Sequence, residues 1–149
     1  MTEHNMQPMT GQPVIAIDTA EEIGDVKHFV VSTDVSRVER LHIDGRKKNA
    51  LFAEWASLES FGADRVMVTA ADDPSESDDD RDLDAAKGNV ELLGARVLDT
   101  AGFEHGTVSD AIFDADTGSI IAIITSEQVR VEQSHVHSLG SYAVVVADT

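Results

Sequence analysis

Cysteine is absent from the 149-residue chain, so neither disulfide bonds nor thiol chemistry is available. A reducing compartment is compatible with this absence. Long apolar runs are absent too, since none approaches the roughly 20 residues needed to cross a bilayer as a helix. The segment 1–13 is polar with scattered Met and is no basic, apolar leader. We therefore expect a soluble, cytoplasmic protein without a membrane span.

Basic residues are scarce: 11 Lys and Arg stand against 28 Asp and Glu, for a formal charge of −17. The mean field around such a chain repels phosphate backbones and anionic membrane surfaces. This argues against direct nucleic-acid binding. The one basic cluster, Arg46-Lys47-Lys48, is predicted to be a solvated hairpin tip, with pairing to an acidic segment as the alternative.

The acidic residues are concentrated in one short stretch between two richer apolar regions. Its members are Asp72, Asp73, Glu76, Asp78, Asp79, Asp80, Asp82 and Asp84, answered only by Arg81. Such a run predicts a solvated, extended linker over residues 72–89. The alternate placing of Asp78, Asp80 and Asp82 resembles a calcium loop, but Leu83 stands where that loop needs Gly. We therefore favour a spacer.

One motif occurs twice in the chain. Ser60-Phe61-Gly62 returns as Ser138-Leu139-Gly140, which is 138 − 60 = 78 positions later. Gly24-Asp25-Val26 returns as Gly106-Thr107-Val108, which is 106 − 24 = 82 positions later. A loop that differs by four residues brings both pairs into register. The chain is therefore predicted to contain two copies of one module.

Each copy has the pattern of short strands, rich in β-branched residues and bounded by turns. In the second copy, residues 108–113 and 120–124 flank the turn sequence Asp114-Ala115-Asp116-Thr117-Gly118 and predict a β-hairpin. The apolar spacing over 55–62 predicts one helical turn closed by Gly62, and a final strand follows in each copy. Several short strands with one such turn are best accommodated in a small, partly closed barrel.

The predicted organisation is a mainly β protein. A disordered N-terminus covers 1–12, a first module 13–71, the acidic linker 72–89 and a second module 90–149. Modules of about 60 residues are marginal alone, so we expect them to pack together or to oligomerise.

The order of elements resembles the PRC-barrel family. Trp55–Val68 is similar to the family's closing segment, Leu93–Asp110 to its opening strands and Asp114–Ile124 to its hairpin. Gln133-Ser134 departs from the Pro-Trp that the family often carries there. The resemblance implies two tandem small barrels used as assembly modules. The family includes the cytoplasmic domain of the photosynthetic reaction centre H subunit and a maturation factor of the small ribosomal subunit. It brings no catalytic residue.

Three groups of residues invite a chemical interpretation. Asp116-Thr117-Gly118 is the tripeptide of aspartic proteases, but its setting favours a hairpin turn. His135 and His137 would share a face of a strand and could hold a metal with Glu132, yet two exposed polar residues are the simpler interpretation. Phe52, Trp55 and Phe61 could form a binding stripe, but their spacing favours a core plug. We assign no catalytic, cofactor or metal residue.

The sequence thus favours a non-enzymatic adaptor that binds a protein partner or a second copy of itself. An alternative is a ribosome-assembly factor that docks on a basic ribosomal protein. A metal-assisted hydrolase using His135 and His137 is the weaker alternative.

Overall fold

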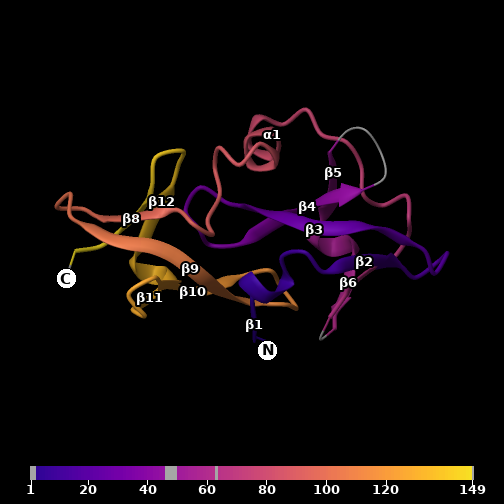
Figure 1. Cartoon of the computed structure of the whole chain (residues 1–149), viewed down its shortest axis with the longest axis horizontal. Helices are drawn as coiled ribbons and strands as arrows, with labels where there is room; N and C mark the ends of the chain where they lie inside the picture. The colour runs from indigo at the N-terminus through magenta and orange to yellow at the C-terminus, as the bar shows by residue number, and fades with distance from the viewer. Residues whose placement is uncertain (1–2, 46–49, 63, 149) are drawn as a thin grey trace.

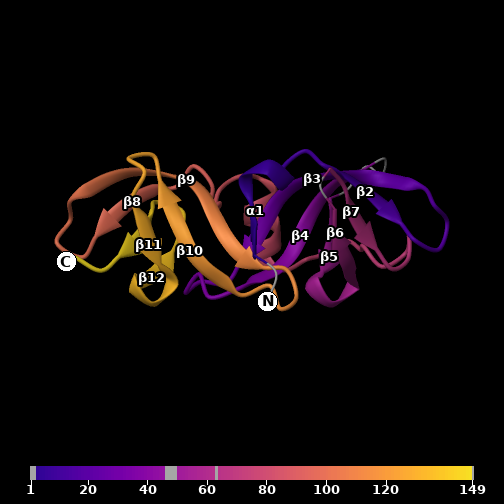
Figure 2. The ribbon, with the colours of Figure 1, turned by 90° about the horizontal axis from the view of Figure 1, so that it is seen from below.

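The computed structural model describes residues 3–45, 50–62 and 64–148. Two sheets dominate it, and they lie side by side along the long axis of the molecule (Figures 1 and 2). The first sheet has the order β5-β4-β3-β2-β7-β6. Its strands are β2 (Pro13–Ala16), β3 (Glu22–Val31), β4 (Val38–Gly45), β5 (Leu51–Glu54), β6 (Leu58–Phe61) and β7 (Val66–Val68).

The second sheet repeats this order as β11-β10-β9-β8-β13-β12. Its strands are β8 (Arg96–Asp99), β9 (Glu104–Asp114), β10 (Ile120–Thr125), β11 (Arg130–Glu132), β12 (Val136–Leu139) and β13 (Val144–Val146). In both sheets one pair is parallel, β2 with β7 and β8 with β13, and the other pairs of the path are antiparallel. The prediction of a mainly β chain with two like modules is confirmed.

The hairpin predicted in the second copy is present as β9 and β10, with residues 115–117 in the turn. The helical turn predicted over 55–62 is only partly right. A single 3-10 turn, η2 (Trp55–Ser57), leads into β6, and η3 (Gln133–His135) does the same before β12. Because β7 offers Leu58 and Phe61 backbone partners, these residues extend as a strand instead of continuing the helix. Gly62 therefore begins the turn to β7 and caps no helix.

The N-terminus is ordered from Glu3, so the expectation of a disordered 1–12 is wrong for the described part. Strand β1 (Glu3–Asn5) pairs with β9 of the second sheet, and the 3-10 turn η1 (Gln7–Met9) follows. Met6 is 0% exposed and Met9 is also buried. A polar average over this segment hides two Met side chains, and their burial offsets the entropy lost on ordering.

The two modules share one hydrophobic core, as their small size led us to expect. The amide of Val38 donates to Gly118 O at 2.8 Å, and the amide of Ile120 donates to Ser36 O at 2.9 Å. These bonds join the two hairpin tips. At the same junction Trp55 Nε1 donates to Ala115 O at 3.2 Å. The modules are therefore one packed unit rather than two bodies on a flexible spacer.

Candidate protein-interaction surface

The acidic stretch folds onto the first module. Helix α1 (Asp80–Ala86) lies over β3 and β4, in view in Figure 1. The Asp79 carboxylate caps the helix by accepting from the amides of Arg81 at 2.9 Å and Asp82 at 3.2 Å. On the inner side Ala85 packs against Val30 and Phe52. The apolar residues of the helix, Ala85 and Ala86, are few among many acids, so the composition did not reveal an apolar face. The prediction of a solvated, extended linker is therefore wrong over this helix.

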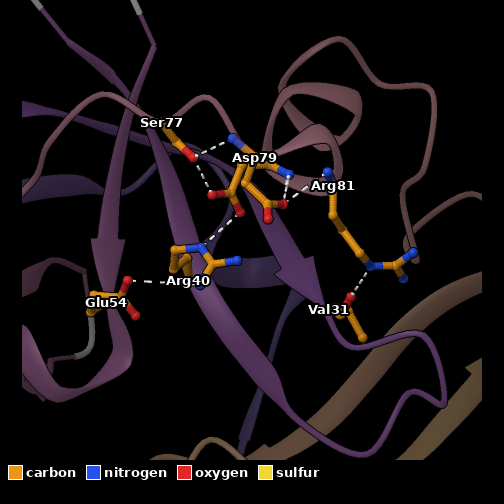
Figure 3. A network of polar contacts seen from close by, with 7 residues as sticks. Val31, Arg40, Glu54, Ser77, Asp79 and Arg81 are labelled. Atoms are coloured by element: carbon orange, nitrogen blue, oxygen red, sulfur yellow. Dashed lines mark hydrogen bonds and ion pairs between the residues drawn. The ribbon is translucent and has the colours of Figure 1, made fainter.

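Asp82 is the anchor of this helix. It is 2% exposed, and its carboxylate accepts from Arg40 Nε at 2.7 Å and from Ser77 Oγ at 2.6 Å (Figure 3). A buried carboxylate is tolerated only with such partners. Next to it Arg81 Nε donates to Val31 O at 2.8 Å, at the edge of β3. Because Asp82 is engaged by Arg40, the alternate acids do not form a calcium loop.

A stack of rings continues this face of the first sheet. The imidazoles of His28 and His42 lie parallel with centroids 5.2 Å apart, and His42 stacks in turn on Phe52 at 5.4 Å. His28 Nδ1 lies 2.8 Å from Glu91 Oε1. Burial, and then the electrostatic interaction with the His28 ring, lower the pKa of His42 to about 4. His42 is therefore neutral at pH 7 and acts as a packing residue.

The second module has an open groove at the end of its barrel, with a cavity of about 440 Å³. Its floor is formed by Val97, Val131 and Val146. Two apolar side chains stand at the rim: Phe103 is 69% exposed and Val129 is 52% exposed. Large apolar side chains gathered at a concave site are typical of binding surfaces.

Charged groups surround this groove. His105 Nε2 lies 2.7 Å from Asp99 Oδ2. The hydrogen bond with His105, and then the amide of Phe103, lower the pKa of Asp99. Arg130, another lining residue, donates from Nε to Glu132 Oε1 at 2.7 Å. Glu127 and Asp148 line the groove as well, so apolar and acidic side chains alternate around it.

The corresponding end of the first module is closed by its own chain. After β7 the amide of Ala71 donates to Asp18 Oδ1 at 3.0 Å, and Ala71 packs against the core. Ser75 then exchanges two backbone hydrogen bonds with Phe52 of β5, at 2.8 and 3.0 Å. A segment that leaves the last strand thus covers the first barrel. The second barrel has no such cover among its described residues.

The predicted metal pair is divided between two elements. His135 lies in η3 and lines the groove, whereas His137 lies in β12, so the alternation argument for a shared strand face does not apply. Both side chains are exposed. Within residues 3–45, 50–62 and 64–148 no group of three or more His, Asp or Glu side chains is placed to hold a metal ion.

The other sequence-based predictions are resolved as follows. Asp116, Thr117 and Gly118 lie in or beside the β9–β10 turn, as predicted. Trp55 is buried in the shared core with its ring 5.1 Å from that of Phe61, so the core plug is right for these two residues, whereas Phe52 packs separately with Val30 and Ala85 under α1. Arg46-Lys47-Lys48 lies outside the described residues.

The sequence analysis did not predict the groove. Phe103 in the turn sequence Gly102-Phe103-Glu104 was a usable signal, because large aromatic residues are uncommon at tight turns.

Comparison with known families adds one finding to this geometry. The model of the PRC-barrel domain matches residues 87–137, about a third of the chain, from the end of α1 to the start of β12. The second module belongs to the PRC-barrel domain family. No curated protein matches the chain. In the described part of the chain, no helix combines the length and apolar character needed to cross a membrane.

Proposed function

We propose that this chain is a non-enzymatic adaptor that binds a protein partner through the groove of its second PRC-barrel module. The carrying observation is the difference between the two barrel ends. Residues 70–75 cover the first, while Phe103 and Val129 stand exposed at the second. The first module has the same strand order, which supports an origin by duplication and a place in the same family.

The partner is expected to insert an apolar side chain between Phe103 and Val129. Asp99 is paired with His105 and Arg130 with Glu132, but Glu127 and Asp148 also line the groove, so its own charge disfavours acidic partners. The formal charge of −17 further disfavours acidic partners. Apolar anchors at the centre of an interface carry most of the binding energy.

The test is capture of proteins from a native lysate of the source organism. The wild type is compared with Phe103→Ser/Val129→Ser, and with Ile17→Ser as the matched control. Ile17 is 53% exposed and directly follows Ala16, which is the counterpart of Asp99 because Ala16 pairs with Val68 of β7 as Asp99 pairs with Val146 of β13. We expect a discrete set of partners that is lost with the groove variant and kept with the control. An identical set from all three proteins would remove the groove from the proposal.

The acidic stretch needs a separate variant, because deleting it would remove Asp82 and the α1 contact with the first sheet. Asp72→Asn/Asp78→Asn changes two exposed acids and leaves the Asp82 contacts in place. Loss of the captured set with this variant would make the acidic surface a contact. Retention would leave the groove as the binding site.

A further inference from the structure

Strand β11 forms one edge of the second sheet, and its backbone register is known. The amide of Thr125 donates to Val129 O at 2.9 Å, and Ile123 lies opposite Val131. Antiparallel pairs alternate between hydrogen-bonded and non-hydrogen-bonded. Thr125 with Val129 and Ile123 with Val131 are therefore the bonded pairs. The backbone N–H and C=O groups of Arg130 and Glu132 point away from β10, toward the open edge.

The same edge is occupied in the first module. The position equivalent to Arg130 is Phe52, since 130 − 52 = 78, and both backbone groups of Phe52 are bonded to Ser75. Among the described residues no backbone partner is recorded for these groups of Arg130 or for the amide of Glu132, whereas the carbonyl of Glu132 is at the N-cap of η3 and accepts the first bond of that turn. Unpaired strand edges are templates for pairing with another chain.

The sequence of this edge, Arg130-Val131-Glu132, is complementary to itself. In an antiparallel pair related by a two-fold axis through Val131, Arg130 of each copy lies opposite Glu132 of the other. On both sides of the axis the amide of Glu132 then donates to Arg130 O of the other copy, and the amide of Arg130 donates to the second lone pair of the Glu132 carbonyl. We infer that a second copy of this chain pairs with β11 in this register and joins the two second sheets.

The side chains fit this register. Arg130 and Glu132 lie on one face of β11 and are already within 2.7 Å of each other. Each guanidinium can therefore turn to the carboxylate of the second copy with little reorientation. Opposite charges across a strand pair stabilise it, while like charges destabilise it by a similar amount. The pairing is short and the chain is strongly acidic, so the association is weak, roughly 10 μM to 1 mM in dissociation constant.

Sedimentation equilibrium of the full chain tests this interface. The protein concentration runs from about 10 μM to 1 mM, and the salt is roughly 0.15 M, where charges are screened beyond about 8 Å. We expect Arg130→Glu and Glu132→Arg, each alone, to raise the dissociation constant about tenfold or more. The double variant R130E/E132R keeps the self-complementary order and restores the wild-type constant. An equimolar mixture of the two single variants forms a mixed dimer, because Glu-Val-Glu then faces Arg-Val-Arg.

Arg96→Glu is the control, because it makes the same change of charge on β8, which pairs with β9 and β13. It leaves the association unchanged apart from a small general effect of charge. A wild type that is monomeric at 1 mM overturns the inference. So does a dimer whose dissociation constant is raised equally by the Arg130 or Glu132 variant and by the Arg96 control. The capture experiment on Phe103 and Val129 is independent of this outcome, so the adaptor proposal and the dimer can fail separately.

Discussion

The two modules have the same strand order but cover their exposed surfaces differently. At the edge of β3, Val31 O is capped by Arg81 of α1, whereas the equivalent Phe113 on β9 faces His4 of β1. The first sheet carries a helix on its outer face. The second carries none in the described residues, and its barrel end is open. The fold thus specifies a core, and the flanking segments decide which surfaces stay free.

The ion pair beneath α1 is the largest expected difference between the modules, because the position equivalent to Arg40 is Ala122 (122 − 40 = 82). Arg40→Leu leaves the buried Asp82 carboxylate without its cation. We expect the free energy of unfolding in urea to fall by about 4 kcal/mol. Arg40→Leu/Asp82→Leu should recover at least half of that loss.

Arg96→Leu, on the exposed side of β8, is the reference for removing an arginine, with an expected cost of about 0.5 kcal/mol. If Arg40→Leu costs no more than Arg96→Leu, α1 does not depend on the ion pair.

The N-terminal cover of the second module depends on Met6. Replacing it by Ala leaves a cavity in the shared core, and we expect a loss of about 3 kcal/mol in the free energy of unfolding. Gln7→Ala changes the exposed neighbour and should cost less than about 0.5 kcal/mol. Equal effects of the two substitutions would show that β1 and η1 contribute little to stability.

Histidine 42 makes the first module sensitive to acid. Its pKa in the folded protein is about 4 against 6.5 unfolded, so the unfolded state binds a proton first as pH falls. Stability contributed by neutral His42 is complete above pH 6.5 and declines down to pH 4. We expect the wild type to lose about 3 kcal/mol more than His42→Phe over this window, measured by urea unfolding at each pH.

Below pH 4 the difference between these two proteins should stay constant, because His42 is then protonated in both states. Parallel pH profiles of the wild type and His42→Phe would contradict a depressed pKa.

Gly118 marks the contact between the modules and has the smallest expected effect. Its φ is +79°, and a Cβ there would lie 3.1 Å from the Trp55 ring. Gly102, with φ +91° and nothing within 4 Å of a Cβ, provides the matched substitution. We expect Gly118→Ala to lower the free energy of unfolding, measured by thermal unfolding, by about 1 kcal/mol more than Gly102→Ala does. Equal losses would show that the Trp55 contact adjusts freely.

The sequence was informative wherever local pattern decides structure. β-branched runs and the turn at Asp114–Gly118 predicted the strands and the hairpin, and the repeat at Ser60 and Ser138 predicted the duplicated sheet. The N-terminus and α1 were missed because their burial depends on partners distant in the chain. Met6 is buried beside β9, and Asp82 is bound by Arg40 across 42 positions. Charge counting cannot detect such pairs.

The groove was missed for a related reason. Phe103 and Val129 have ordinary turn and strand neighbours, and nothing in the local sequence marks their side chains as exposed beside a groove. In the first module, residues 70–75 cover the corresponding end. A surface left open by the path of the chain becomes visible only when the two modules are compared in three dimensions.

Hydrogen exchange of the protein with and without its captured partner most directly tests the claim that the second barrel end binds it. We expect slower exchange in residues 97–105 and 127–135, around Phe103 and Val129, and no change in residues 13–23 of the first module. Protection confined to the first module, or to α1, would contradict the claim.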